Sequence, residues 1–157
     1  MLIEVTINGS RVKAHVDAGA TLYQFLRDRG LFSVKCGCSS SICGMCTVLL
    51  DGKPILSCSM LAARADGHNI TTLEGVQKEA EEIGRFIAGE GAEQCGFCNP
   101  GYMMNTIALL RENPNPTEDE VLKYLSGNLC RCSGYQGQLI GIMKYVEYAN
   151  SLSKEGV

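Results

Sequence analysis

Nine cysteines are the feature that most restricts how this chain of 157 residues can fold. The chain begins with alternating apolar and polar residues and shows no signal-peptide pattern, so we expect a cytoplasmic protein. Thiols stay reduced there, and a patterned cysteine cluster then indicates metal binding rather than disulfides. Eight of the cysteines form two sets of four, Cys38, Cys43, Cys46 and Cys58 in the first half and Cys95, Cys98, Cys130 and Cys132 in the second.

The first set has the spacing C-x4-C-x2-C-x11-C, whose opening matches plant-type ferredoxins. Three thiolates from one loop would hold one side of a cluster, and Cys58 would reach it from the next pair of strands. Gly37 and Gly44 suit this interpretation, because a backbone folded tightly around sulfide needs positive φ angles and close approach. A structural zinc is the alternative, but it more often shows two C-x2-C pairs, and this half has one. The spacing therefore favours a [2Fe–2S] cluster.

The second set combines a C-x2-C motif, Cys95 to Cys98, with a C-x-C motif, Cys130 to Cys132. The two motifs can meet at one end of an antiparallel helical bundle, so we expect a four-thiolate site. Spacing alone leaves iron–sulfur and zinc open, because C-x-C serves as a ligand pair for several metals. Either metal would offset four thiolate charges and would be needed for this end of the bundle to fold.

The ninth cysteine, Cys36, lies two residues before a predicted ligand. A spare thiol is the simplest interpretation, and ligand exchange, redox sensitivity or packing are the alternatives. His15 and His68 are the only histidines. They lie on the polar face of a predicted strand and in a predicted turn, so we expect both to be solvated.

The first half of the sequence has the alternating pattern of β-strands. Asn8-Gly9 and Asp51-Gly52 are strong hairpin signals, because both turn positions need positive φ angles. Between the hairpins, a capping box beginning at Thr21 predicts a short helix, with Gly30 as its stop. The predicted strands are residues 2–7, 12–16, 47–50, 54–56 and 69–73.

From residue 76 the apolar period becomes that of helices, which predicts a four-helix bundle. The predicted helices are residues 76–90, a helix from Pro100 that ends before Pro114, one that begins at a capping box at Thr117 and ends near Gly127, and residues 137–152. The apolar positions expected to face the core in the last two are Val121, Leu122, Leu125, Leu139, Ile140, Met143, Val146 and Ala149. The sequence therefore predicts an α+β protein with domains over residues 1–75 and 76–157.

The net charge and the composition exclude several classes of function. A net charge of −3 argues against a nucleic-acid or anionic-membrane partner, since both bind basic patches. No run of about 18 apolar residues is present, so we expect no membrane span. We find no nucleophile–base pair and no phosphate-binding loop, so we expect cofactors to carry the chemistry.

Taken together, the cysteine motifs and their surroundings resemble the small iron–sulfur subunit of the xanthine dehydrogenase/aldehyde oxidase family of molybdenum hydroxylases. The resemblance covers nearly the whole chain. It rests on the motifs VKCGCSSSICGMCTVLLDGKPILSC (34–58), TTLEG (71–75), QCGFCNPG (94–101) and GNLCRCSGY (127–135). It implies a plant-type ferredoxin domain of the β-grasp type followed by a four-helix domain, each binding one [2Fe–2S] cluster.

The resemblance also implies partners and a function. In the family, the second cluster lies near a molybdopterin on a separate large subunit, and the first faces FAD on a medium subunit or an external acceptor. The family pattern makes Gln94 and Cys132 the residues closest to the pterin. The chain would relay electrons from molybdenum through the second and first clusters to FAD, within a heterotrimer or its dimer.

The substrate belongs to the large subunit, so it has to be inferred from the family. A purine such as xanthine is our first expectation, followed by other N-heterocycles. Aldehyde, carbon monoxide, nicotinate and hydroxybenzoyl-CoA enzymes are alternatives in the same family, and an iron–sulfur redox sensor or a zinc-binding interaction module are alternatives of another class. The chain departs from the family pattern at four positions that are not predicted ligands, Cys36, Asn99, Ser133 and Gln138.

Overall fold

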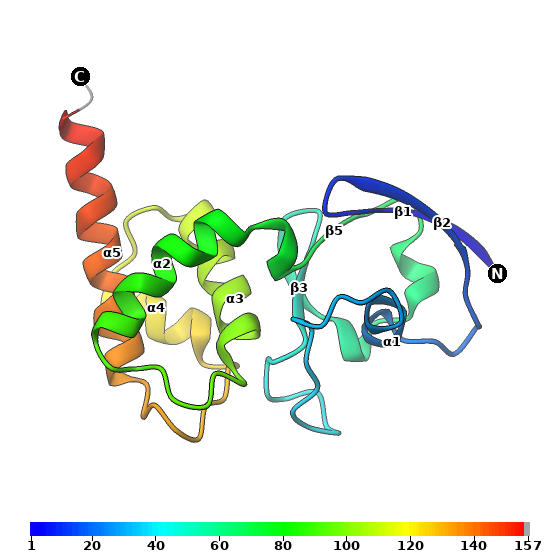
Figure 1. Ribbon diagram of the computed structural model, residues 1–157, viewed down its shortest axis with the longest axis horizontal. Coiled ribbons are helices and arrows are strands. Elements are labelled where there is room, and N and C mark those ends of the chain that lie inside the picture. The colour runs from blue at the N-terminus through cyan, green and yellow to red at the C-terminus, as the bar shows by residue number, and fades with distance from the viewer. Residues whose placement is uncertain (156–157) are drawn as a thin grey trace.

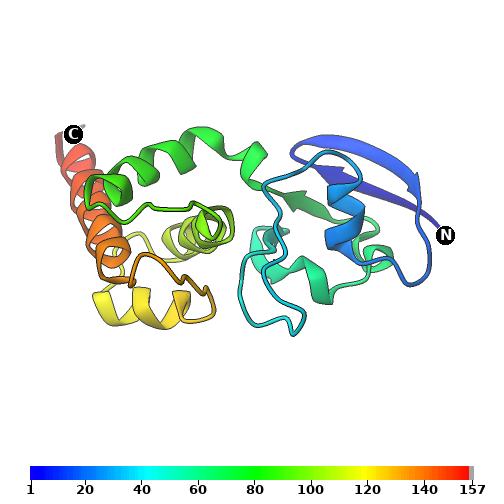
Figure 2. The same ribbon diagram turned by 60° about the horizontal axis from the view of Figure 1, so that its bottom comes forward.

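The computed structural model describes residues 1–155 and contains a half built on a β-sheet and a helical half (Figure 1). The two halves lie side by side, with helix α5 (Gln136–Glu155) at the end far from the sheet (Figures 1 and 2). The α+β class predicted from the sequence is confirmed. Residues 156 and 157, the last two of the predicted helical domain, lie outside the described residues.

Five strands form one sheet in the order β2-β1-β5-β3-β4. Strand β1 is parallel to β5, and the other neighbouring strands are antiparallel. Both predicted hairpin turns are present, since φ is 48° and 83° at Asn8 and Gly9, and 49° and 82° at Asp51 and Gly52. The strands are β1 Leu2–Ile7, β2 Ser10–His15, β3 Thr47–Leu50, β4 Lys53–Leu56 and β5 Asn69–Thr71.

Four strand bounds differ from the prediction: β2 ends at His15 and β4 begins at Lys53, one residue earlier than predicted in each case, and two bounds differ by two residues. Strand β2 begins at Ser10, because the two-residue turn pairs Ile7 directly with Ser10. Strand β5 ends at Thr71, because the chain then forms a 3₁₀ turn, η3 (Leu73–Gly75). Two further 3₁₀ turns, η1 (Ser57–Ser59) and η2 (Ala62–Ala65), were not predicted, since such short turns show no apolar period.

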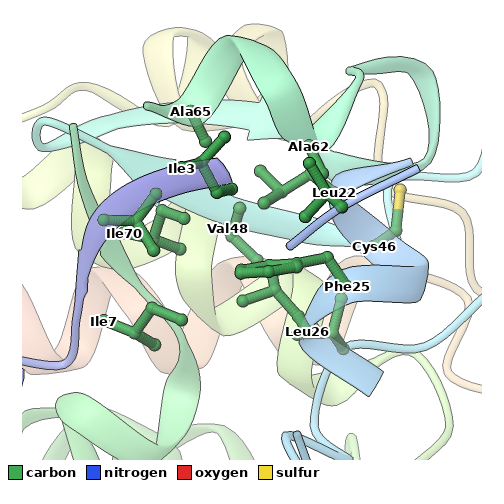
Figure 3. Packing of buried hydrophobic residues seen from close by; sticks show 13 residues of the cluster. Ile3, Ile7, Leu22, Phe25, Leu26, Cys46, Val48, Ala62, Ala65 and Ile70 are labelled. Carbon is green, nitrogen blue, oxygen red and sulfur yellow. The ribbon is translucent and has the colours of Figure 1, made fainter. Parts of the chain in front are cut away.

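Helix α1 (Leu22–Arg27) packs its buried side chains against the sheet (Figure 3). It begins with the predicted capping box: Thr21 Oγ1 accepts the Gln24 N–H at 3.2 Å, and Gln24 Oε1 accepts the Thr21 N–H at 3.0 Å. The ligand candidate Cys46 belongs to this core, which fixes the first cysteine loop to the sheet (Figure 3). The other labelled members of the core are Ile3, Ile7, Leu22, Phe25, Leu26, Val48, Ala62, Ala65 and Ile70.

The helical half contains the four predicted helices, α2 Gln77–Gly89, α3 Asn99–Glu112, α4 Glu118–Leu125 and α5. Helix α4 begins with the predicted capping box, in which Glu120 N–H donates to Thr117 Oγ1 and Thr117 N–H donates to Glu120 Oε2. None of the helices within residues 1–155 combines the length and apolar character that crossing a bilayer requires. The buried core of this half is built mainly from Ile83, Ile87, Tyr102, Ile107, Val121, Leu125, Leu139, Ile142 and Val146.

Two predicted core positions are wrong. Leu122 is 50% exposed and lines a cavity of about 340 Å³ between α3, α4 and α5, whereas Val121 and Leu125, one turn apart, are the buried residues of α4. Ile140 is 37% exposed, whereas Ile142, which was not among the predicted core positions, is buried. In each helix the prediction included the residue next to the true apolar stripe.

Helix α3 joins the two halves. Its Met104 and Ala108 side chains pack with Leu49 of β3 in a small buried cluster. At the start of the helix, Gly101 lies so close to the first cysteine loop that an added Cβ would be 2.3 Å from the Gly44 carbonyl oxygen. The helix is therefore buried on several sides and fixes one half against the other.

Candidate metal centres

The loop at residues 37–46 and the turn η1 bring together the first four predicted ligands as two pairs. The thiols of Cys38 and Cys43 lie within hydrogen-bonding reach of each other, as do those of Cys46 and Cys58. Ser57 holds η1 to the loop, because its Oγ and its backbone N–H donate to the Cys46 carbonyl at 2.7 and 3.3 Å. This contact places Cys58 at the loop, as expected for a fourth ligand.

The thiols of the first site have unequal electrostatic surroundings. The backbone N–H of Ile42, followed by the Cys43 thiol, lowers the pKa of Cys38 to about 6. Burial instead raises the pKa of Cys46 to about 12. The Ile42 N–H that favours the Cys38 thiolate is also suited to donate to a cluster-bound sulfur. A positive φ of 73° at Gly44 allows the loop to turn back on itself here.

The second site lies where two loops meet at the end of the helical half. One loop leads into α3 and carries Cys95 and Cys98, and the other leads into α5 and carries Cys130 and Cys132. The sulfur atoms of Cys95 and Cys132 are 3.7 Å apart, and the thiols of Cys98 and Cys130 lie within hydrogen-bonding reach of each other. The structure thus brings the C-x2-C and C-x-C motifs together.

Burial and hydrogen bonding oppose each other at this site. Burial would raise the pKa of Cys130, but hydrogen bonds from the Ser133 hydroxyl and N–H and from the Cys132 N–H lower it to about 7. The two Ser133 contacts measure 3.1 and 3.3 Å. Burial raises the pKa of Cys98 to about 12. Ser133 was noted in the sequence only as a departure from the family pattern, and the structure shows that it contacts a predicted ligand.

Both sites fit a two-iron cluster. Within residues 1–155, no three or more His, Cys, Asp or Glu side chains are arranged around a point that could hold one metal ion. The thiols lie in pairs instead, and two thiolates per iron is the donor set of a [2Fe–2S] cluster with four cysteines. The assignment of the eight individual ligands stays a prediction.

The predicted pterin-facing residues lie on the surface. Gln94, Cys95 and Cys132 are all exposed, and the neighbouring Phe97 side chain is 44% exposed. Cys36 is also exposed, and its thiol lies 3.1 Å from the Cys38 carbonyl oxygen.

The two histidines take no part in either site. His15 and His68 are exposed, as predicted. His68 in addition pairs with Asp51 at 2.5 Å, a contact that the sequence did not indicate.

Sequence reasoning missed the residues that connect the two sites. The Leu129 N–H donates to the Cys43 carbonyl at 2.9 Å, and the buried Asn128 amide donates to the Gly44 carbonyl at 3.2 Å. Lys35 Nζ lies 3.4 Å from the Gly96 carbonyl oxygen and 5.0 Å from the Phe97 ring centroid. Asn128 lies inside a recognised motif, but no local pattern shows that its partner is in the other half.

Comparisons with known families agree with these sites. A model described as "2Fe-2S iron-sulfur cluster binding domain" matches residues 5–82, and one described as "[2Fe-2S] binding domain" matches residues 72–143. The two models together cover both cysteine sets.

Individual relatives point to one class of enzyme subunit. The chain is 50% identical to the xanthine dehydrogenase iron-sulfur-binding subunit of Escherichia coli O157:H7, over 85% of this chain and 87% of the relative. It is 46% identical to the nicotine 6-hydroxylase small subunit of Paenarthrobacter nicotinovorans, over 85% and 82%. Among solved structures, a chain of quinoline 2-oxidoreductase from Pseudomonas putida 86 matches with a TM-score of 0.88 and 38% identity, over 96% of both chains. The chain therefore belongs to the family of small iron–sulfur subunits of xanthine dehydrogenase/aldehyde oxidase-type molybdenum hydroxylases, and it is part of an oxidoreductase.

Proposed function

We propose that the chain is the electron-transfer subunit of a multi-subunit molybdenum-dependent hydroxylase or dehydrogenase. It relays electrons from the molybdopterin centre of a large subunit, through two [2Fe–2S] clusters, to FAD or another acceptor. The observation that carries this proposal is the pairing of eight thiols into two sites whose loops are in direct contact. When bound, such clusters supply one-electron carriers with potentials that the protein adjusts through hydrogen bonds and exposure.

The chain's own residues would hold the two clusters and set their surroundings. The proposed ligands are Cys38, Cys43, Cys46 and Cys58 for the first and Cys95, Cys98, Cys130 and Cys132 for the second. Cys43, Cys46 and Cys98 are buried and shield one side of each site from water. The Ile42 and Ser133 N–H groups stabilise negative charge on sulfur.

The exposed edge of the second site is the proposed contact with the large subunit. Gln94 and Cys132 face the pterin in this proposal, and the exposed Phe97 and Leu129 side chains give the same region apolar surface that a partner can cover. A medium subunit with FAD completes a heterotrimer or its dimer. We place the complex in the cytoplasm.

The proposed substrate is a purine such as xanthine, or another N-heterocycle. Support comes from the relatives, whose names refer to xanthine, nicotine and quinoline, all nitrogen heterocycles. The aldehyde, carbon monoxide, nicotinate and hydroxybenzoyl-CoA enzymes of the family are alternatives. The pocket that decides between them belongs to the large subunit.

The test is purification of the native complex under anaerobic conditions. We expect about four iron and four sulfide per chain, two of each per cluster, with a large molybdenum subunit present. A panel of purines, other heterocycles and aldehydes, assayed with dye acceptors, then identifies the substrate.

Two outcomes would contradict the proposal. If the protein contains zinc and no acid-labile sulfide, it is a zinc-stabilised interaction module. Iron–sulfur clusters without any molybdenum partner, combined with a response to oxidants that is lost in Cys36→Ser, would indicate a redox sensor.

A further inference from the structure

The two cysteine loops are joined by one backbone hydrogen bond. Leu129 N–H donates to the Cys43 carbonyl oxygen at 2.9 Å. Cys43 is a proposed ligand of the first cluster, and Leu129 is bonded directly to Cys130, a proposed ligand of the second. The route from one ligand sulfur to the other therefore follows covalent bonds except at this single hydrogen bond.

The side chain of Asn128 holds the loops in this position. It is 3% exposed, and both ends of its amide are used: Nδ2 donates to the Gly44 carbonyl at 3.2 Å, and Oδ1 accepts from Asn105 Nδ2 at 2.5 Å. Its backbone N–H donates to the Leu125 carbonyl at 2.9 Å, which anchors the residue to the end of α4. A buried amide with all these partners has one favourable orientation, since moving it would leave polar groups unpaired.

Glycines allow the loops to approach this closely. A Cβ added to Gly44 would lie 2.5 Å from Asn128 Nδ2 and 2.6 Å from the Gly127 carbonyl oxygen. A Cβ added to Gly101 would lie 2.3 Å from the Gly44 carbonyl oxygen. The Cys43–Gly44 segment is thus enclosed by α3 on one side and by the Asn128 loop on the other, so a change at Asn128 acts on a closely packed contact.

We propose that Asn128 is a positioning residue for electron transfer between the two clusters, and this inference rests on the proposed function. Its amide fixes the Gly44 carbonyl and so maintains the hydrogen bond between Leu129 and Cys43. In the transfer itself, one cluster is oxidised by one electron and the other is reduced by one, while no covalent bond or proton changes place. Electronic coupling decays less steeply through bonds and a hydrogen bond than across a gap, so loosening this contact slows the transfer.

The main test is Asn128→Ala in the full chain within its native complex. The loaded protein is reduced by one electron with a photogenerated flavin radical, and the redistribution of that electron between the clusters is followed by visible absorption. Exchange splitting in the EPR spectrum of the dithionite-reduced protein is a second readout. We expect slower redistribution and a smaller splitting, with iron and sulfide contents unchanged.

Asn105→Ala is the milder companion variant. It removes the donor to Asn128 Oδ1 but leaves the bond between Asn128 and Gly44, so we expect a smaller slowing in the same direction. If Asn128→Ala loses iron, Asn105→Ala decides the question. The matched control is Asn150→Ala, which removes an amide–amide bond to Asn115 on the far side of the helical half and should leave both readouts unchanged.

Two results would overturn the inference. Fully loaded Asn128→Ala and Asn105→Ala proteins with wild-type redistribution and splitting would refute it and leave the proposed function intact. A wild-type protein that holds zinc or no metal would refute the proposed function, and the inference with it.

Discussion

At the residue scale, the predicted ligands differ in how readily they lose a proton. Cys38 and Cys130 have pKa values of about 6 and 7, whereas burial raises those of Cys46 and Cys98 to about 12. Metal binding needs all of them as thiolates, so the buried pair must release protons when a cluster is inserted. Each site thus combines a thiol that is ready to bind with one that ionises only when the metal is present.

Ser133→Ala tests the hydrogen bonding at the second cluster. It removes the hydroxyl donor 3.1 Å from Cys130 Sγ and leaves the Ser133 backbone N–H in place. Loss of a hydrogen-bond donor disfavours the reduced form of the cluster, which carries more negative charge. We therefore expect the midpoint potential of the second cluster to fall by tens of millivolts. For one electron, about 59 mV corresponds to about 1.4 kcal/mol. An EPR-monitored redox titration measures this, with the first cluster as an internal reference. The control is Ser151→Ala, whose hydroxyl donates to the Tyr148 carbonyl, and an equal fall there would contradict the explanation.

Cys98→Ala tests the ligand assignment. We expect iron and sulfide contents to fall by about half, because a [2Fe–2S] cluster needs four thiolates, while the first cluster keeps its spectrum. Metal analysis and visible absorption measure both effects. Cys36→Ala is the matched control and should keep the full iron content. Loss of both clusters in Cys98→Ala, or of one in Cys36→Ala, would show that the ligand sets are wrong.

At the element scale, the sequence predicts the features that local signals determine and does not predict those that show no periodicity. Two Asx-Gly turns and two capping boxes were predicted correctly, because a few neighbouring residues determine them. The 3₁₀ turns and the exposure of Leu122 and Ile140 were not predicted, because they depend on how the elements pack against one another. Asn128 is the clearest case at the site, since its Gly44 partner is 84 residues away.

Gly101→Ala tests how closely α3 packs on the first cysteine loop. Alanine favours a helix by about 1 kcal/mol over glycine, but here its Cβ would meet the Gly44 carbonyl oxygen at 2.3 Å. We therefore expect a net loss of about 1–3 kcal/mol in the free energy of unfolding, as for other overpacked sites. Thermal unfolding of the loaded protein measures the change.

Gly84→Ala is the control for Gly101→Ala. Gly84 lies in the middle of α2, and an added Cβ would be 3.7 Å from the Met103 side chain, an ordinary contact. Here the helix propensity of alanine should dominate, so we expect stabilisation by about 0.5–1 kcal/mol. Stabilisation by both substitutions would show that α3 can move away from the loop at little cost.

At the scale of the whole molecule, the partly buried carboxylate of Glu74 connects the loop before the first site to the start of the helical half. Glu74 in η3 accepts hydrogen bonds from the Ser33 N–H and hydroxyl at 2.9 and 2.6 Å and from the Thr72 hydroxyl at 2.5 Å. Burial would raise the pKa of Glu74, but these hydrogen bonds outweigh it and lower the pKa below its usual value of 4.5. The ionised form therefore stabilises the folded protein.

Glu74→Gln should show this stabilisation as a pH dependence. Because the folded-state pKa is lowered, the stabilisation is present above pH 4.5 and is lost as the pH falls through the folded-state value. We expect the variant to be less stable than wild type at pH 7 by about 1 kcal/mol after solvent screening, and the difference to shrink in acid. Urea unfolding of both proteins from pH 7 to acid measures it. Glu81→Gln, an exposed partner of Arg85, is the control, and a constant Glu74→Gln difference would contradict the assignment.

The contact of Leu49 with Met104 and Ala108 makes the two halves of the chain difficult to separate. Cutting the chain at the predicted domain boundary, near residue 76, would uncover these apolar side chains on both pieces and open the Gly44–Asn128 contact to water. Each fragment would then expose apolar surface close to its own set of cysteines. We therefore expect natural recombination to exchange the two halves of the chain together. A larger side chain on one side of this contact would require a smaller side chain on the other side.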